Sequence, residues 1–166
     1  MDVPLSPERL MQFEWRVRQV YLALSDRIDL AEELRFFCRC MAEDERKDIV
    51  VLERATHLQK TMERVPSVPE TDLVEVEKSI VTAEALAAQA VLTADGVLRL
   101  ALHIEGSTLK RLDRMWIQGV GTAFGSVLQE LAPDAEVRTR RLIEAIHTFG
   151  IDPSLREEVA SLWAAH

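Results

Sequence analysis

The stretch RCMAEDERKD, residues 39–48, places two carboxylates on the side of a helix that should be apolar. Phe37 and Met41 lie at helical spacing and define the apolar stripe. With 100° of rotation per residue, Glu45 and Asp48 fall inside that stripe. A carboxylate that faces a protein core is destabilising unless another group compensates its charge. The stretch therefore predicts an amphipathic helix and a compensating group inside the fold.

The same pattern recurs on three other predicted helices. The inward acids are Glu14, about 40° from Leu10; Glu84, about 20° from Leu73; and Glu105, about 80° from Val97. One inward acid on each of four helices suggests a shared partner, for which a metal ion is the first candidate. Glu77 is the reserve choice on the third helix.

Helical periodicity dominates the whole chain, and no strand-like alternation stands out, so we predict an all-α fold. Start signals are Ser6-Pro7, Asp29 with Glu32, and Asp72 with Glu75, and Asp95-Gly96 is expected to be a turn. The predicted helices span about 7–25, 29–64, 72–94, 97–117, 125–131, 135–149 and 153–163. Residues 1–117 would form an antiparallel four-helix bundle, and residues 118–166 a helical C-terminal extension.

Composition and short motifs exclude several classes of function. The net charge of -8 argues against nucleic acid as a partner. No apolar run reaches the roughly 20 residues of a membrane span, and no signal peptide is visible, so we expect a cytoplasmic protein. Cys38 and Cys40 point about 200° apart on a helix and cannot readily share a metal ion. Arg138, Arg140 and Arg141 are expected on a solvated helix face.

Glu14-x6-Tyr21 followed by Glu45-x-x-Asp48 resembles the rubrerythrin branch of the ferritin-like superfamily. The resemblance implies a ferritin-like bundle, commonly dimeric, with a two-metal site of iron or manganese. Its ligands in this chain would be Glu14, Glu45, Asp48, Glu84 and Glu105.

The chain departs from that family where histidines are expected, because Asp48 and Thr108 stand in their places. An all-oxygen site suits Mn, Mg or Ca better than redox-active iron. Cysteines of the rubredoxin type are also missing from the sequence. The departures therefore leave open whether the protein is an enzyme, and dioxygen or peroxide chemistry does not follow from the resemblance.

Two functional hypotheses remain open from the sequence. In the first, the carboxylates hold metal ions, and the protein is a divergent oxidoreductase. In the second, the site is degenerate and metal-free, and the bundle acts as a structural or protein-interaction module. The second predicts basic partners or water at the glutamates and an exposed apolar patch on the C-terminal helices. A homodimer or an unknown protein partner is compatible with both.

The ferritin-like topology carries a geometric condition. It requires the second and third helices to be parallel, so the link between them must travel back along the bundle. Residues 65–71 can bridge this distance only if the second helix ends early, near Thr56–Gln59. A third helix antiparallel to the second would instead indicate a simple up-down bundle.

Overall fold

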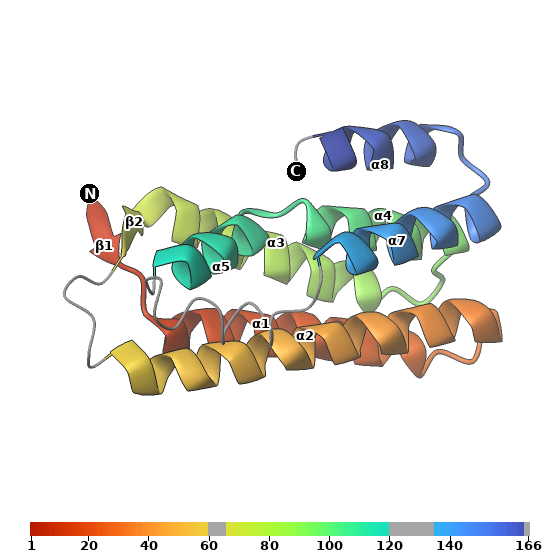
Figure 1. Cartoon of the computed structure of the whole chain (residues 1–166). Coiled ribbons are helices and arrows are strands. Elements are labelled where there is room, and N and C mark those ends of the chain that lie inside the picture. Colours follow the sequence, from red (N-terminus) through yellow and green to blue (C-terminus); the bar gives the residue numbers. More distant parts are fainter. Residues whose placement is uncertain (60–65, 120–134, 165–166) are drawn as a thin grey trace.

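The computed structural model describes residues 1–59, 66–119 and 135–164, and they are predominantly helical (Figure 1). The all-α fold class is therefore confirmed. The predicted short helix at 125–131 lies outside the described residues. The elements are β1 Asp2–Pro4, α1 Pro7–Ser25, α2 Glu32–Gln59, β2 Ser67–Pro69, α3 Glu70–Ala87, α4 Ala94–Glu105, α5 Thr108–Gly119, α7 Ala135–Phe149 and α8 Ser154–Ala164.

Two of the helix starts are set by hydroxyl caps. The Ser6 side chain accepts a hydrogen bond from the backbone N–H of Arg9, and Pro7 occupies the first turn of α1, as predicted. Thr93 caps α4 in the same way by accepting from the N–H of Gly96 at 3.1 Å. The expected turn at Asp95-Gly96 is therefore wrong, because both residues belong to the first turn of α4.

The two predicted capping boxes are also wrong. α2 begins at Glu32, and the Asp29 carboxylate is instead held by Arg27, with bonds of 3.0 and 2.6 Å. α3 begins at Glu70 after Pro69, so Asp72 lies within its first turn. In both places, the acid three residues before a glutamate is a surface or first-turn residue rather than the cap.

The fourth predicted helix is divided into two. α4 ends at Glu105, where the N–H of Gly106 bonds to the carbonyl of Leu102, and α5 starts at Thr108. This break resets the helical phase, so positions after residue 107 cannot be placed from a wheel begun at Val97. Wheel positions computed on one continuous helix therefore fail for α5.

The helix directions are those of an up-down arrangement. β1 and β2 pair antiparallel with Asp2 opposite Pro69, which brings the starts of α1 and α3 to one end. At the other end, Arg27 donates to the carbonyls of Ala87, Gln89 and Ala90, just after α3. α1 and α3 thus run in the same direction, and α2 runs against both (Figure 1). The parallel second and third helices required by a ferritin-like topology are not observed.

The strand pair was missed because three residues are too few to show alternation. Its effect is local but useful: Leu5, which follows β1, is fully buried and its carbonyl accepts from the indole N–H of Trp116 at 2.9 Å. The indole bond ties the N-terminal end of the chain to α5.

The C-terminal helices complete the core. α7 packs against α2 and α4, and α8 packs against α4 and α7, outermost in the view of Figure 1. Leu142, Ile146 and Leu155 are fully buried in the same apolar cluster as α1 and α2. The domain division at residue 117 stays a prediction. No helix in the described ranges combines the length and apolarity needed to span a bilayer.

We predict that Gly150→Ala destabilises the protein by about 1–3 kcal/mol, measured by urea unfolding. A Cβ at Gly150 would lie 2.5 Å from the carbonyl oxygen of Ile146, a backbone atom that cannot move aside cheaply. Gly96→Ala is the matched control, since its Cβ would meet the end of the Leu92 side chain. Equal unfolding free energies for the two variants would contradict this account of the α7 terminus.

Candidate functional site

Three carboxylates from α1 and α2 meet inside the bundle. Glu14 and Glu45 are fully buried, and Asp48 is nearly so. One oxygen from each lies within 4.8 Å of one from each of the other two, a spacing that could hold a metal ion. The sequence therefore correctly indicated a buried carboxylate group.

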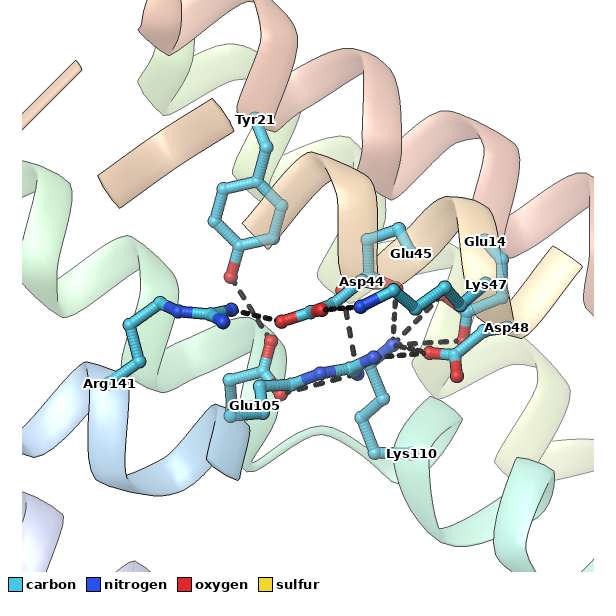
Figure 2. A network of polar contacts seen from close by, with 10 residues as sticks. Glu14, Tyr21, Asp44, Glu45, Lys47, Asp48, Glu105, Lys110 and Arg141 are labelled. Atoms are coloured by element: carbon cyan, nitrogen blue, oxygen red, sulfur yellow. Dashed lines mark hydrogen bonds and ion pairs between the residues drawn. The ribbon is translucent and has the colours of Figure 1, made fainter. Parts of the chain in front are cut away.

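The ammonium of Lys110 occupies the middle of this carboxylate group. Its Nζ lies 2.9 and 3.1 Å from the two oxygens of Glu14, 2.5 Å from Glu45 Oε2 and 3.1 Å from Asp48 Oδ2. Figure 2 shows Lys110 rising from α5 toward the acids of α1 and α2. The lysine is itself buried, so these are charge-assisted bonds shielded from water.

A second cation, Arg138 of α7, contacts two of the same acids and shares Asp48 Oδ2 with Lys110. Its Nη2 donates to Asp48 Oδ2 at 2.8 Å, and its Nη1 lies 3.7 Å from both Glu45 Oε1 and Glu105 Oε2. Tyr21 of α1 donates its hydroxyl to Glu105 Oε1 at 3.2 Å. Glu105 is therefore joined to the three-carboxylate group through Arg138 and to α1 through Tyr21.

A neighbouring ion group fastens α7 to α2 closer to the surface. Asp44 is buried and pairs with Arg141 of α7 and with Lys47, whose Nζ lies 3.0 Å away (Figure 2). Arg140, in contrast, is exposed and pairs with Glu136. The expectation that all three arginines lie on a solvated face is thus wrong for Arg138, which is 6% exposed, and correct for Arg140.

The cations do not balance the buried acids. Asp113 of α5 is also buried against Glu14, so five carboxyl groups (Glu14, Glu45, Asp48, Glu105 and Asp113) face two cations. Among the described side chains, three formal negative charges are left over. Neither oxygen of Asp113, nor Oε1 of Glu45, receives a hydrogen bond from any described residue. Within this part of the chain, protons or a bound cation would supply the balance.

Burial and the excess of negative charge raise the pKa values of several of these acids. Burial raises the pKa of Glu14 and Glu45 well above the usual range, and the Asp113 charge adds to the effect on Glu14. Burial likewise raises the pKa of Glu105, and it raises that of Asp113 to about 6. Each of these carboxyl groups therefore takes up a proton at a higher pH than it would in water.

Asp48 and Lys110 remain charged, because neighbouring groups of opposite charge outweigh the effect of burial on their pKa values. Burial would raise the pKa of Asp48, but Lys110 and Arg138 outweigh it and lower that pKa. Burial would lower the pKa of Lys110, but Glu14 and Glu45 raise it well above its usual value. An ammonium held in this way gives up its proton with difficulty.

Two residues that the sequence assigned to the site lie elsewhere. Glu84 is partly exposed and accepts two bonds from Arg16, at 2.8 and 2.7 Å, and Glu77 pairs with the same arginine. The prediction that Glu84 points inward is wrong, because the buried face of α3 is centred on other positions than the predicted apolar stripe. The buried positions of α3 are Leu73, Val76, Ile80, Ala83 and Ala87, whose centre lies about 60° from Glu84. Thr108 donates to Glu75 and does not reach the cluster.

The sequence reasoning missed Lys110, Asp113 and Arg138. A signal for two of them existed: Arg138 lies about 40° from buried Leu142, and Asp113 about 40° from buried Leu109, each on an apolar face. Lys110 gave no such signal, since it lies about 100° from Leu109. Its burial depends on how α5 restarts after the break at Gly106.

Comparison with known proteins gives no relative for this chain: no family model, curated protein or solved structure matches it. The cluster is therefore interpreted from its own chemistry.

We predict that stability falls as pH rises from about 5 to 8, and that Asp113→Asn reduces this slope. The pKa of Asp113 is raised from 3.8 to about 6, so its contribution is fully present below 3.8 and lost as pH rises through 6. Between pH 5 and 8 the corresponding loss is about 1–1.5 kcal/mol, measured by urea unfolding at each pH.

Glu84→Gln serves as the control for this experiment, because Arg16 lowers the pKa of the Glu84 carboxyl and reverses the sign. That variant should lose a small amount of stability at neutral pH and leave the slope from pH 5 to 8 unchanged. If the Asp113→Asn and wild-type proteins had the same slope, Asp113 would not titrate in the folded state.

Proposed function

We propose that this protein is a helical structural or protein-interaction module whose interior carboxylates are paired with side-chain cations in place of metal ions. The observation that carries the proposal is the position of Lys110, whose Nζ lies within 3.1 Å of Glu14, Glu45 and Asp48. An ammonium has three donors and one positive charge, and it satisfies one oxygen or more of each acid.

A metal ion at this point would have to displace the ammonium. Lys110 is 7% exposed, and its pKa is raised by the acids around it, so it would remain a buried cation beside the metal. Breaking a buried ion pair leaves an uncompensated charge and costs about 3–5 kcal/mol. The residues present therefore fit an ammonium better than a divalent ion.

Arg138 extends the same arrangement to the second half of the cluster. Its guanidinium lies between Asp48, Glu45 and Glu105, so the two side-chain cations together contact four acids from three helices. Such a network fixes the register of α1, α2, α4, α5 and α7 relative to one another. This supports a role in holding one defined packing.

The surface supports the interaction half of the proposal. Trp15 on α1 and Phe36 on α2 are 55% and 61% exposed, which is unusual for aromatic side chains of this size. Val137 and Ile151, in the C-terminal part, are exposed as well. A homodimer is one form that such contacts could take, and it remains a proposal. A rubrerythrin-type oxidoreductase is not proposed, since α2 and α3 are antiparallel.

One specific observation favours a second candidate, a site for a divalent cation. Among the described residues, three formal negative charges remain uncompensated, and Glu45 Oε1 and the two Asp113 oxygens, which accept no hydrogen bond there, could contribute to binding a cation in addition to Lys110. Carboxylate oxygens suit Mn²⁺, Mg²⁺ or Ca²⁺. Alternatively, the excess negative charge is balanced by protons on the acids whose pKa is raised, Glu14, Glu45, Glu105 and Asp113.

Metal analysis and Mn²⁺ titration calorimetry separate the two candidates. The wild-type protein should contain and bind less than about 0.2 equivalents of any divalent or iron ion, because Lys110 fills the site. One or more equivalents bound, with protection against heating, would overturn the proposal in favour of the second candidate.

Lys110→Met provides the complementary test. It leaves three buried carboxylates without their ammonium, so we expect a loss of about 3–5 kcal/mol at pH 7 that Mn²⁺ partly restores. Lys47→Met is the matched control, since Lys47 is half-exposed and pairs with Asp44 of the neighbouring ion group. A Lys110→Met protein as stable as that control would contradict the role given to Lys110.

A further inference from the structure

Three of the most exposed large apolar side chains lie at the tips of three loops. Ile28 is 93% exposed between α1 and α2, Val91 is 80% exposed between α3 and α4, and Ile151 is 86% exposed between α7 and α8. All three loops lie at the same end of the bundle, on the right in Figure 1. We call residues 26–33, 88–95 and 150–154 the loop end.

Polar contacts hold these loops together. Arg27 donates to the carbonyls of Gln89 at 2.6 Å and Ala90 at 3.2 Å, which joins the first loop to the second. Asp95 accepts from the backbone N–H groups of Ile151 at 2.8 Å and Asp152 at 3.2 Å, which joins the second to the third.

Each loop also has an apolar or conformational anchor beneath its tip. Leu30 and Leu92 are buried next to exposed Ile28 and Val91. Gly150 lets the chain turn close to the carbonyl of Ile146 before Ile151. In the first two loops one apolar residue is thus buried and its neighbour is exposed. The contacts that fix each loop therefore keep the residue at its tip in solvent. A scattered surface isoleucine would not need such support.

The charge of the loop end is strongly one-sided. Its three segments hold one basic residue, Arg27, and six acidic ones: Asp26, Asp29, Glu32, Glu33, Asp95 and Asp152. The segments therefore carry five of the eight net negative charges of the chain. Arg27 pairs with Asp29 and Arg99 of α4 pairs with Asp152, whereas Asp26, Glu32 and Glu33 are exposed to solvent. Such a surface repels nucleic acid and anionic lipid, and it attracts a basic partner.

We propose that the loop end docks an amphipathic, basic helix of a partner protein, with Ile28, Val91 and Ile151 against its apolar side and the exposed acids Asp26, Glu32 and Glu33 opposite its lysines or arginines. Apolar contacts at the centre with charges at the rim are the usual anatomy of a specific interface. The inference rests on the proposed interaction role. It does not depend on Lys110, so the two can fail separately.

The experiment uses the full chain and a synthetic amphipathic helix of leucine and lysine as the probe, followed by amide NMR shifts. We expect shifts at residues 26–33, 88–95 and 150–154, and at least about tenfold weaker binding by the triple variant Ile28→Ser, Val91→Ser, Ile151→Ser. The double variant Val74→Ser, Val81→Ser is the control, since it removes two exposed apolar residues of α3.

Several outcomes would overturn this proposal. These are no binding, shifts mapped to other surfaces, or equal affinity for the triple variant. Equal binding of a probe with glutamate in place of lysine would remove the role of charge. Self-association of the wild type that the triple variant abolishes would show that a second copy occupies the loop end. None of these results alters the metal content that tests the proposed function.

Discussion

The fold depends on placing one ammonium among three carboxylates. Lys110 comes from α5, whereas Glu14 and the pair Glu45 and Asp48 come from α1 and α2, so the contact requires three helices in one register. Carboxylates buried this fully would destabilise the fold if only apolar side chains surrounded them. The break between α4 and α5 makes the contact possible, because the restarted helix turns Lys110 inward.

The C-terminal part of the chain shares in the same constraint. Arg138 of α7 shares Asp48 with Lys110 and also pairs with Glu105, which Lys110 does not contact, and Arg141 pairs with Asp44 on α2. α7 is therefore held by ion pairs as well as by buried Leu142 and Ile146. Because the acids still outnumber the cations, the interior also depends on protons, and its electrostatics couple stability to pH.

Much of this could be predicted from the sequence, for physical reasons that differ between elements. The 3.6-residue periodicity identified the long helices and the inward acids Glu14, Glu45 and Asp48. It misplaced Glu84, which lies about 60° from the centre of the buried face of α3 and pairs with Arg16. The periodicity of apolar residues does not indicate in which direction each helix runs. The family resemblance predicted parallel second and third helices, whereas α2 and α3 are antiparallel. Lys110 could not be found, since its inward position depends on a helix break and on tertiary packing.

The central claim is that Lys110 takes the place of a metal ion. An anomalous-difference map, from crystals grown with Mn²⁺ and measured near the manganese edge, tests it most directly. The account predicts no anomalous peak among Glu14, Glu45 and Asp48, and continuous density for the Lys110 side chain ending between them. A strong peak at that point, with Lys110 turned away, would contradict it.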